Sequence, residues 1–123
     1  MVFNILIDNT DAHEKNHVLL VDATQRYRLS PAFDIVPTCQ AMGYQQMRVG
    51  TYGTESTLQN ALSEHRAFAL TSTRASEVVG EVATVVGSWQ THFARHGVTK
   101  GDMAQLQRAI DREFLYEQRL RTR

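Results

Sequence analysis

One apolar pattern in the second half of the chain is typical only of an amphipathic helix. Its apolar residues follow one another at steps of three and four: Ala75, Val78, Val79, Val82, Val85, Val86, Trp89 and Phe93. That spacing places them along one face of an α-helix, the face that a core buries. Thr71 precedes the pattern as a predicted N-cap, and Gly97 follows it as a predicted left-handed stop. The sequence therefore predicts one long core helix.

Shorter helical patterns lie on both sides of this helix. Leu58, Ala61 and Leu62 indicate a short helix before it. Thr99, with Asp102 three residues later, resembles a capping box and opens a last helix. The apolar face of that last helix is expected to consist of Met103, Leu106, Ile110 and Phe114, and its arginine-rich end (Arg119, Arg121, Arg123) is expected to extend into solvent. Gly80 and Gly87 each cost a helix ~1 kcal/mol relative to alanine, so we expect a neighbour to pack closely there.

The first third of the chain favours a small hairpin instead. Residues 2–7 fit either a short helix or a strand, and Asp8 to Asp11 have turn chemistry. Residues 17–21 then predict a buried strand and residues 27–30 a returning strand, with a turn near Thr24 and Gln25. Beyond Pro37 the pattern is weak, with a possible short strand over residues 46–49. The predicted fold class is mainly α with a small β-hairpin, an α+β arrangement.

Composition limits the function classes that remain. The chain has 123 residues, 42% of them hydrophobic and 21% charged, which fits one globular unit and excludes fibrous or disordered classes. Basic and acidic residues balance at 13 each, so we expect neither direct nucleic-acid binding nor membrane binding. Residues 1–64 hold seven acidic and four basic residues, an excess that suits a divalent metal but that chance explains equally well. With one cysteine, Cys39, expected as a buried structural thiol, and no signal-like segment, we expect a cytoplasmic protein.

Three polar residues form the candidate site: Asp11, Asn16 and Asp34. Phosphoryl transfer needs a group that accepts the proton of the substrate hydroxyl, and it needs oxygen ligands for magnesium. If the hairpin turns near Thr24 and Gln25, Asn16 faces Phe33, and Asp34 is one step away. Strand neighbours lie ~5 Å apart, so Asn16 and Asp34 can share one ion. The alternative is a loop held together by Asp and Asn side chains without any ligand.

Two segments carry a resemblance to a known family. Residues 9–16, Asn-Thr-Asp-Ala-His-Glu-Lys-Asn, resemble the N-x-D-x-H-x-K-N catalytic loop of the HipA-like serine/threonine kinases, toxins of bacterial toxin–antitoxin pairs. Residues 3–7, Phe-Asn-Ile-Leu-Ile, are similar to the lead-in of that loop. Residues 29–37 resemble the family's L-x-P-x-Y/F-D-hydrophobic segment, which serves where other kinases carry Asp-Phe-Gly. The helix that ends near Trp89 is also similar to the C-terminal lobe of the family, so the resemblance covers nearly the whole chain.

The resemblance implies a protein-kinase-like C-terminal lobe over residues 1–123. Residues 1–37 would hold the catalytic loop, hairpin and metal-binding segment, and residues 54–120 a helical subdomain. The family transfers the γ-phosphoryl group of ATP to a serine or threonine hydroxyl of a protein, with Mg²⁺ bound. By the same resemblance Asp11 is the catalytic base, and Asn16 and Asp34 are the magnesium ligands. The residues near the nucleotide are His13, Lys15, Phe33 and Asp34. Its known target class is an aminoacyl-tRNA synthetase, and its partner is a small helix-turn-helix antitoxin.

One departure from the family pattern changes the functional expectation. The family's amino-terminal lobe and its ATP-cradling loop find no counterpart, since Gly43, Gly50 and Gly53 match neither phosphate-loop pattern. We therefore expect a fragment of the catalytic lobe or one piece of a split enzyme, inactive alone, and leave open whether the chain itself is an enzyme. The alternative is a non-catalytic interaction module that binds an antitoxin, the missing kinase lobe or a second copy of itself.

Overall fold

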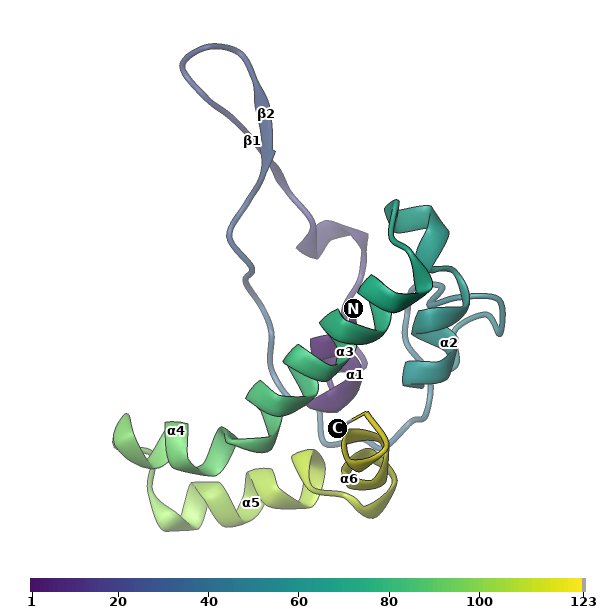
Figure 1. Cartoon of the computed structure of the whole chain (residues 1–123). Helices are drawn as coiled ribbons and strands as arrows, with labels where there is room; N and C mark the ends of the chain where they lie inside the picture. The colour runs from purple at the N-terminus through teal and green to yellow at the C-terminus, as the bar shows by residue number, and fades with distance from the viewer. Residues whose placement is uncertain (123) are drawn as a thin grey trace.

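A short helix with a fully buried inner face lies at the centre of the structure. The computed structural model describes residues 1–122, and in it helix α1 (Val2–Leu6) contacts α2, α3 and α6 (Figure 1). Ile5 and Leu6 of α1 are completely buried. Around them the core gathers apolar side chains from most of the chain: Ile7, Val49, Leu58, Ala61, Val79, Ala83, Val86, Trp89 and Ile110. The ambiguous segment at residues 2–7 is thus a helix.

The elements follow one another in a simple order. After α1 come a 3-10 turn, η1 (Glu14–Asn16), and two antiparallel strands, β1 (Leu19–Val21) and β2 (Tyr27–Leu29). The helical part then runs through α2 (Leu58–Ser63), η2 (His65–Phe68), α3 (Ser72–Gly87), α4 (Trp89–Arg95), α5 (Lys100–Ile110) and α6 (Glu113–Leu120). The fold is therefore mainly helical with one two-stranded hairpin, as the sequence predicts. Within residues 1–122, no helix is both long and apolar enough to cross a membrane.

The predicted helix caps are confirmed, but the long helix is divided in two. The side chains of Thr71 and Thr99 accept the backbone N–H of Arg74 (3.2 Å) and Asp102 (3.1 Å). Gly97 has a φ of +78°, the left-handed conformation expected of a helix stop. The helix breaks at Ser88, whose hydroxyl donates to the carbonyl of Val85 (2.8 Å). This break turns α4 away from the direction of α3.

The core face of α3 differs in part from the predicted one. Val85 is 63% exposed, although the pattern assigns it to the core, and Ala83 is fully buried in its place. The close packing expected at Gly80 is confirmed, because a Cβ there would lie 3.1 Å from the carbonyl oxygen of Thr122. The absence of a side chain at Gly80 lets the end of the chain lie against α3.

The last predicted helix is also two helices. α5 ends at Ile110, and α6 starts at Glu113, which leaves Phe114 47% exposed instead of in the predicted apolar face. Arg119 is only 2% exposed, so the prediction that the arginine-rich end extends into solvent is wrong for this residue. Arg121 is exposed, and Arg123 lies outside the described residues.

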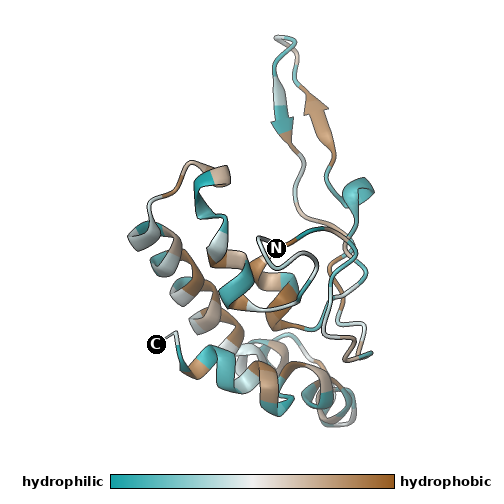
Figure 2. Ribbon diagram, turned by 90° about the vertical axis from the view of Figure 1, so that its right-hand side faces the viewer, coloured by the Kyte–Doolittle hydropathy of each residue, from teal (hydrophilic) through white to brown (hydrophobic). Residues whose placement is uncertain are grey.

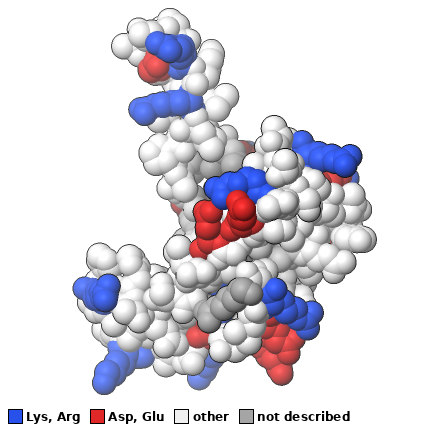
Figure 3. Space-filling view, viewed as in Figure 1, with Lys and Arg blue, Asp and Glu red and all other residues white. Residues whose placement is uncertain are grey.

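Both strands of the hairpin are exposed, contrary to the prediction of a buried first strand. Leu19, Val21, Tyr27 and Leu29 are 51–72% exposed. The hairpin stands away from the helical body, with β1 hydrophobic throughout (Figure 2). On the face in Figure 3, charged side chains lie near the hairpin tip, and uncharged side chains cover the ribbon below them. This ribbon therefore presents apolar side chains that the helical body leaves uncovered.

The hairpin register is shifted by one residue from the predicted one. Leu19 pairs with Leu29 and Val21 with Tyr27, which centres the turn on Thr24. The Asp22 carboxylate accepts the backbone N–H groups of Thr24 (2.8 Å) and Arg26 (3.0 Å), and Gln25 takes a left-handed φ of +60°. A three-residue loop with a left-handed last residue is a common hairpin turn, and it accounts for the shift.

Residues 43–57 form irregular structure where a short strand over 46–49 was a possibility. Two isolated bridges, Tyr44–Glu55 and Gly50–Gly53, fold the segment back on itself. The buried Asn60 of α2 closes it, since its side chain accepts the N–H of Tyr52 (2.9 Å) and donates to the carbonyl of Glu55 (2.9 Å). Cys39, predicted to be buried, is exposed; its backbone has a left-handed φ of +58°, and its thiol lies 3.8 Å from the carbonyl oxygen of Pro37.

Candidate active site

The loop that follows α1 is buried before it reaches the candidate site. Asp8 has a left-handed φ of +59°, which ends the helix and redirects the chain. Asn9 bonds back to the Asn4 carbonyl through its N–H (2.9 Å), and its side-chain oxygen accepts the N–H of Asp11 (3.3 Å). Asp8, Asn9 and Thr10 are each at most 3% exposed. Asp11 is the first exposed residue after this anchored stretch.

Asn16 is held in place by the turn that contains it. Residues 14–16 form η1, and the Asn16 side-chain oxygen accepts the backbone N–H of His13 (2.9 Å). His17 extends the arrangement, with its Nδ1 3.2 Å from the carbonyl oxygen of His13. These contacts point the Asn16 amide nitrogen away from its own turn.

That amide nitrogen meets Asp34 from the other end of the hairpin. Asn16 Nδ2 donates to Asp34 Oδ2 over 3.0 Å. The predicted proximity of these two residues is therefore confirmed, even though the hairpin register differs by one residue from the predicted one. Asp34 has a left-handed φ of +55°, a conformation that Asp and Asn tolerate better than most residues. The departure from the strand direction there brings its carboxylate toward Asn16.

Asn16, Phe33 and Asp34 share one cavity. Its volume is ≈ 220 Å³, and its wall includes side chains from α1 as well as both ends of the hairpin: Met1, Phe3, Asn4, Ala12, Asn16, His17, Leu29, Ser30, Pro31, Ala32, Phe33, Asp34 and Ile35. Phe33 is 44% exposed. The cavity thus combines an exposed aromatic ring with a carboxylate and an amide.

The other predicted site residues lie outside this wall. Asp11 is exposed, and its carboxylate makes no hydrogen bond or ion pair with the described residues. Lys15 is exposed on η1. His13 is partly buried, and its Nδ1 has no hydrogen-bond partner in the part of the chain that the structure describes. That nitrogen is a polar group for which the fold itself provides no partner.

The oxygen atoms at the hairpin base suit a magnesium ion. Mg²⁺ prefers hard oxygen ligands, keeps several waters and uses one or two protein carboxylates. Asp34 supplies a carboxylate that is bound internally through Oδ2 only, and the Asn16 carbonyl oxygen has a second lone pair beyond the one that His13 uses. Among residues 1–122, no cluster of three or more His, Cys, Asp or Glu side chains has the arrangement of a metal site. An ion held by the Asn16–Asp34 pair would take most of its ligands from water, as Mg²⁺ commonly does.

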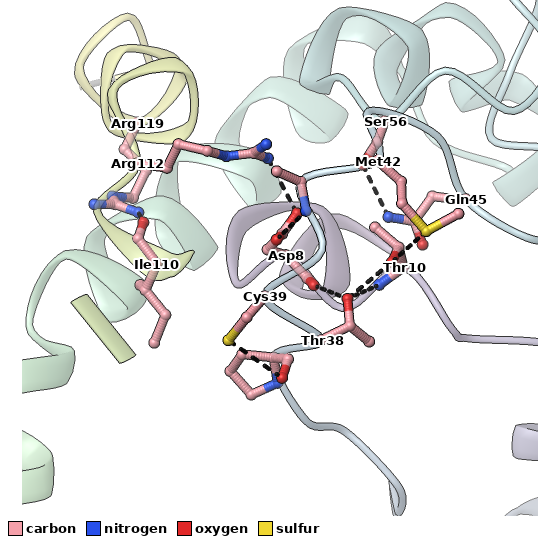
Figure 4. Close-up of polar contacts among 12 residues, drawn as sticks. Asp8, Thr10, Thr38, Cys39, Met42, Gln45, Ser56, Ile110, Arg112 and Arg119 are labelled. Carbon is pink, nitrogen blue, oxygen red and sulfur yellow. Dashed lines mark hydrogen bonds and ion pairs between the residues drawn. The ribbon is translucent and has the colours of Figure 1, made fainter. Parts of the chain in front are cut away.

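Sequence reasoning missed the residues that anchor the site segments from behind. The Thr38 N–H and hydroxyl both donate to the carbonyl of Asp8, over 3.0 and 2.7 Å, and the hydroxyls of Thr10 and Thr38 lie 2.8 Å apart (Figure 4). Arg112, which precedes α6, donates to Asp8 Oδ1 over 3.0 Å. No spacing signal connects residue 8 with residue 112, so only the tertiary structure reveals this contact.

The comparisons with known proteins agree with the resemblance seen in the motifs. The family model of the HipA-like C-terminal domain matches residues 1–89, which contain the loop, the hairpin and helices α1 to α3. Curated proteins and solved structures yield no significant match. Because the matched segment spans well over half of the 123 residues, the chain belongs to the family of HipA-like C-terminal domains.

Proposed function

We propose that this chain is the catalytic lobe of a toxin-type serine/threonine kinase, with the protein-kinase-like fold of its family. It would take part in the transfer of the ATP γ-phosphoryl group to a protein hydroxyl. The observation that supports this most directly is the hydrogen bond between Asn16 and Asp34, which unites the two proposed magnesium ligands. Family membership supports the same function independently.

Each candidate residue has a role consistent with its surroundings. The oxygens of Asn16 and Asp34 would hold Mg²⁺, which neutralises charge on the phosphates when bound. Phe33 lines the same cavity and would lie against the nucleotide. The exposed Lys15 ammonium would face the phosphates. The family resemblance places His13 near them as well, and its Nδ1, which is buried without an internal partner, would have to turn outward to reach them.

Asp11 would carry the proton transfer. A carboxylate that is exposed and free of internal partners can accept the proton of a serine or threonine hydroxyl on one of its oxygens. The hydroxyl oxygen then forms the new bond to the γ-phosphorus, the bond to the bridging oxygen of ADP breaks, and ADP leaves with that electron pair. The anchored backbone of Asn9 and Thr10 would keep Asp11 oriented during this step.

Calorimetric titration with a non-hydrolysable ATP analogue, with and without Mg²⁺, tests the proposal. The wild-type chain should bind the analogue more tightly with Mg²⁺ present. Asp34→Asn should lose this magnesium dependence, because an asparagine there still accepts the hydrogen bond from Asn16 but has no charge. Asp11→Asn should keep it, because Asp11 is not a proposed metal ligand.

The matched control is Asp102→Asn, an exposed residue of α5 at the opposite end of the molecule from the hairpin (Figure 1). This variant should bind as the wild type does. If binding is independent of Mg²⁺, or if Asp34→Asn and Asp102→Asn behave alike, the proposed kinase site is refuted.

The exposed ribbon favours a second candidate function, an interaction module. Four large apolar side chains of the hairpin are more than half exposed: Leu19, Val21, Tyr27 and Leu29. Exposed apolar surface of this extent marks an interaction site in many proteins. An antitoxin, another kinase lobe or a second copy of the chain would be the partner.

Sedimentation velocity separates the two candidates. If the chain is an interaction module, it should self-associate or bind a partner, and the double variant Tyr27→Ser/Leu29→Ser should weaken that association. Asp34→Asn should then leave the nucleotide affinity unchanged. A monomeric chain with magnesium-dependent nucleotide binding supports the catalytic lobe instead.

A further inference from the structure

We propose that Arg112 is a positioning residue for the candidate active site and that it acts through Asp8. This inference rests on the proposed function for its catalytic meaning, although its structural part can be tested separately. Arg112 lies between α5 and α6, outside the segment that the family model matches.

Asp8 joins the segment that leads to Asp11 to the segment that follows Asp34. Its carbonyl oxygen accepts two hydrogen bonds from Thr38, one from the backbone N–H (3.0 Å) and one from the hydroxyl (2.7 Å). The same hydroxyl lies 2.8 Å from that of Thr10. Asp8 and Thr10 lead directly to Asp11, and Thr38 follows soon after Asp34. A shift of Asp8 therefore moves both segments that carry the proposed base and metal ligands.

The conformation of Asp8 needs support from outside the loop. Its backbone is left-handed, and its side chain is 4% exposed. One carboxylate oxygen accepts the N–H of Ala41 (3.0 Å), and the other accepts Arg112 Nη2 (3.0 Å). A buried carboxylate is costly without a cation, and Arg112 is the only cation in ion-pair contact with it among the described residues. Figure 4 shows the guanidinium reaching Asp8 from the C-terminal helices.

Arg112 is itself held firmly. Its carbonyl oxygen accepts the N–H groups of Leu115 and Tyr116 (both 2.9 Å), which start α6. The preceding residues, Ile110 and Asp111, are both bound by the buried side chain of Arg119. The guanidinium, whose Nη2 bonds Asp8 while its buried Nε has no partner among the described residues, thus connects the start of α6 to the loop at Asp8.

Two variants separate positioning from simple charge neutralisation. Arg112→Met leaves the Asp8 carboxylate unpaired, so both stability and site geometry should suffer. Arg112→Met/Asp8→Asn removes the charge as well but keeps a side-chain oxygen for the Ala41 N–H, and asparagine tolerates the left-handed φ. The double variant should regain most of the melting temperature but not the site geometry, because the loop is no longer tied to α6.

Two measurements read the outcome. The first is the chemical shift of the Asn16 side-chain amide, which reports its hydrogen bond to Asp34 without any ligand. The second is the affinity for Mg²⁺ and the ATP analogue, which we expect to fall roughly tenfold in both variants, as is typical for residues that support metal ligands. Val79→Ala in the core of α3 is the control, since it lowers stability and removes no hydrogen bond or ion pair of Asp8.

The results distinguish failure of this inference from failure of the proposed function. A shifted Asn16 amide in both variants, with an unshifted amide in Val79→Ala, supports positioning. If the double variant recovers the wild-type amide shift, Arg112 only neutralises a buried charge and the inference is overturned. The amide signal can shift as expected in both variants while the wild type binds the nucleotide analogue no more tightly with Mg²⁺ than without it. In that case the positioning role stands and the proposed function fails. If Arg112→Met does not fold, Arg112→Lys takes its place. Lysine keeps the charge but lacks the paired, planar N–H donors of the guanidinium, so we expect the same shift of the Asn16 amide.

Discussion

Replacing Arg119 with methionine should lower the free energy of unfolding by about 3 kcal/mol. The sequence alone assigns this residue to a solvated, arginine-rich end, yet its side chain is 3% exposed. It forms an ion pair with Asp111, donates to the carbonyl of Ile110 and lies 5.5 Å from the ring centroid of Tyr116. Methionine keeps the apolar volume of the stem and removes only the charged head.

The magnitude follows from what the substitution leaves behind. Removing one partner of a buried ion pair costs about 3–5 kcal/mol when the other charge stays uncompensated. Asp111 is 20% exposed and keeps hydrogen bonds from Trp89 Nε1 (3.2 Å) and Gln90 Nε2 (3.1 Å), which favours the lower end of that range. For a chain of this size, a loss of that order lowers the melting temperature by roughly 10 °C.

Urea unfolding followed by fluorescence measures this change directly. The chain has a single tryptophan, Trp89, and its indole N–H contacts Asp111, so its emission reports the region in question. Arg121→Met is the control, because Arg121 pairs with Glu117 on the surface and should contribute less than about 1 kcal/mol. Equal, small effects of the two substitutions would show that Arg119 is no more than a surface arginine.

Two further predictions concern the rest of the fold. Gly50→Ala should destabilise the chain by about 3 kcal/mol or prevent folding, because its Cβ would lie 2.0 Å from the carbonyl oxygen of Asn60. Gly101→Ala should instead stabilise α5 by up to about 1 kcal/mol in the same urea assay, because its Cβ would make an ordinary 3.7 Å contact. Hydrogen bonds to the carboxylate lower the pKa of Asp22 below its ordinary value of 3.8; the largest effect comes from the Thr24 hydroxyl, and the backbone N–H groups of Arg26 and Thr24 add to it. Since the folded pKa is the lower one, the contribution of Asp22 to the turn is complete above the unfolded pKa and is lost as pH falls through the folded one; the NMR shifts of the Thr24 and Arg26 amides should follow that titration, and Asp22→Asn should abolish it.

Local signals in the sequence are enough to predict two helix starts, the stop at Gly97 and the site pair. Thr71 and Thr99 are caps because a threonine hydroxyl satisfies a free N–H of the first turn, a rule that needs no tertiary context. The proximity of Asn16 and Asp34 requires only that one hairpin join them, so it is confirmed although the observed turn differs by one residue from the predicted one. The short range of both signals explains why they were reliable.

The errors concern one local polar contact and several tertiary contacts that apolar periodicity does not encode. Apolar periodicity continues from α3 into α4, but the hydroxyl of Ser88 bonds the Val85 carbonyl and the helix breaks there. Arg119 fits the pattern of an exposed helix end, yet its buried side chain pairs with Asp111, which also accepts the indole N–H of Trp89. Such contacts join residues whose separation has no period, so periodicity cannot reveal them.

The hairpin base lies between an anchored segment and an exposed one. On one side, hydrogen bonds of Thr38 and an ion pair of Arg112 fix the loop at Asp8 to the helical body. On the other side, the ribbon beyond Asn16 and Asp34 contacts little of that body and leaves its apolar side chains exposed. A partner that covers the ribbon would therefore act on the Asn16–Asp34 pair from the opposite end to Arg112. If such a partner shifts the Asn16–Asp34 pair, and the pair holds magnesium as proposed, binding of the partner and binding of the metal are thermodynamically coupled.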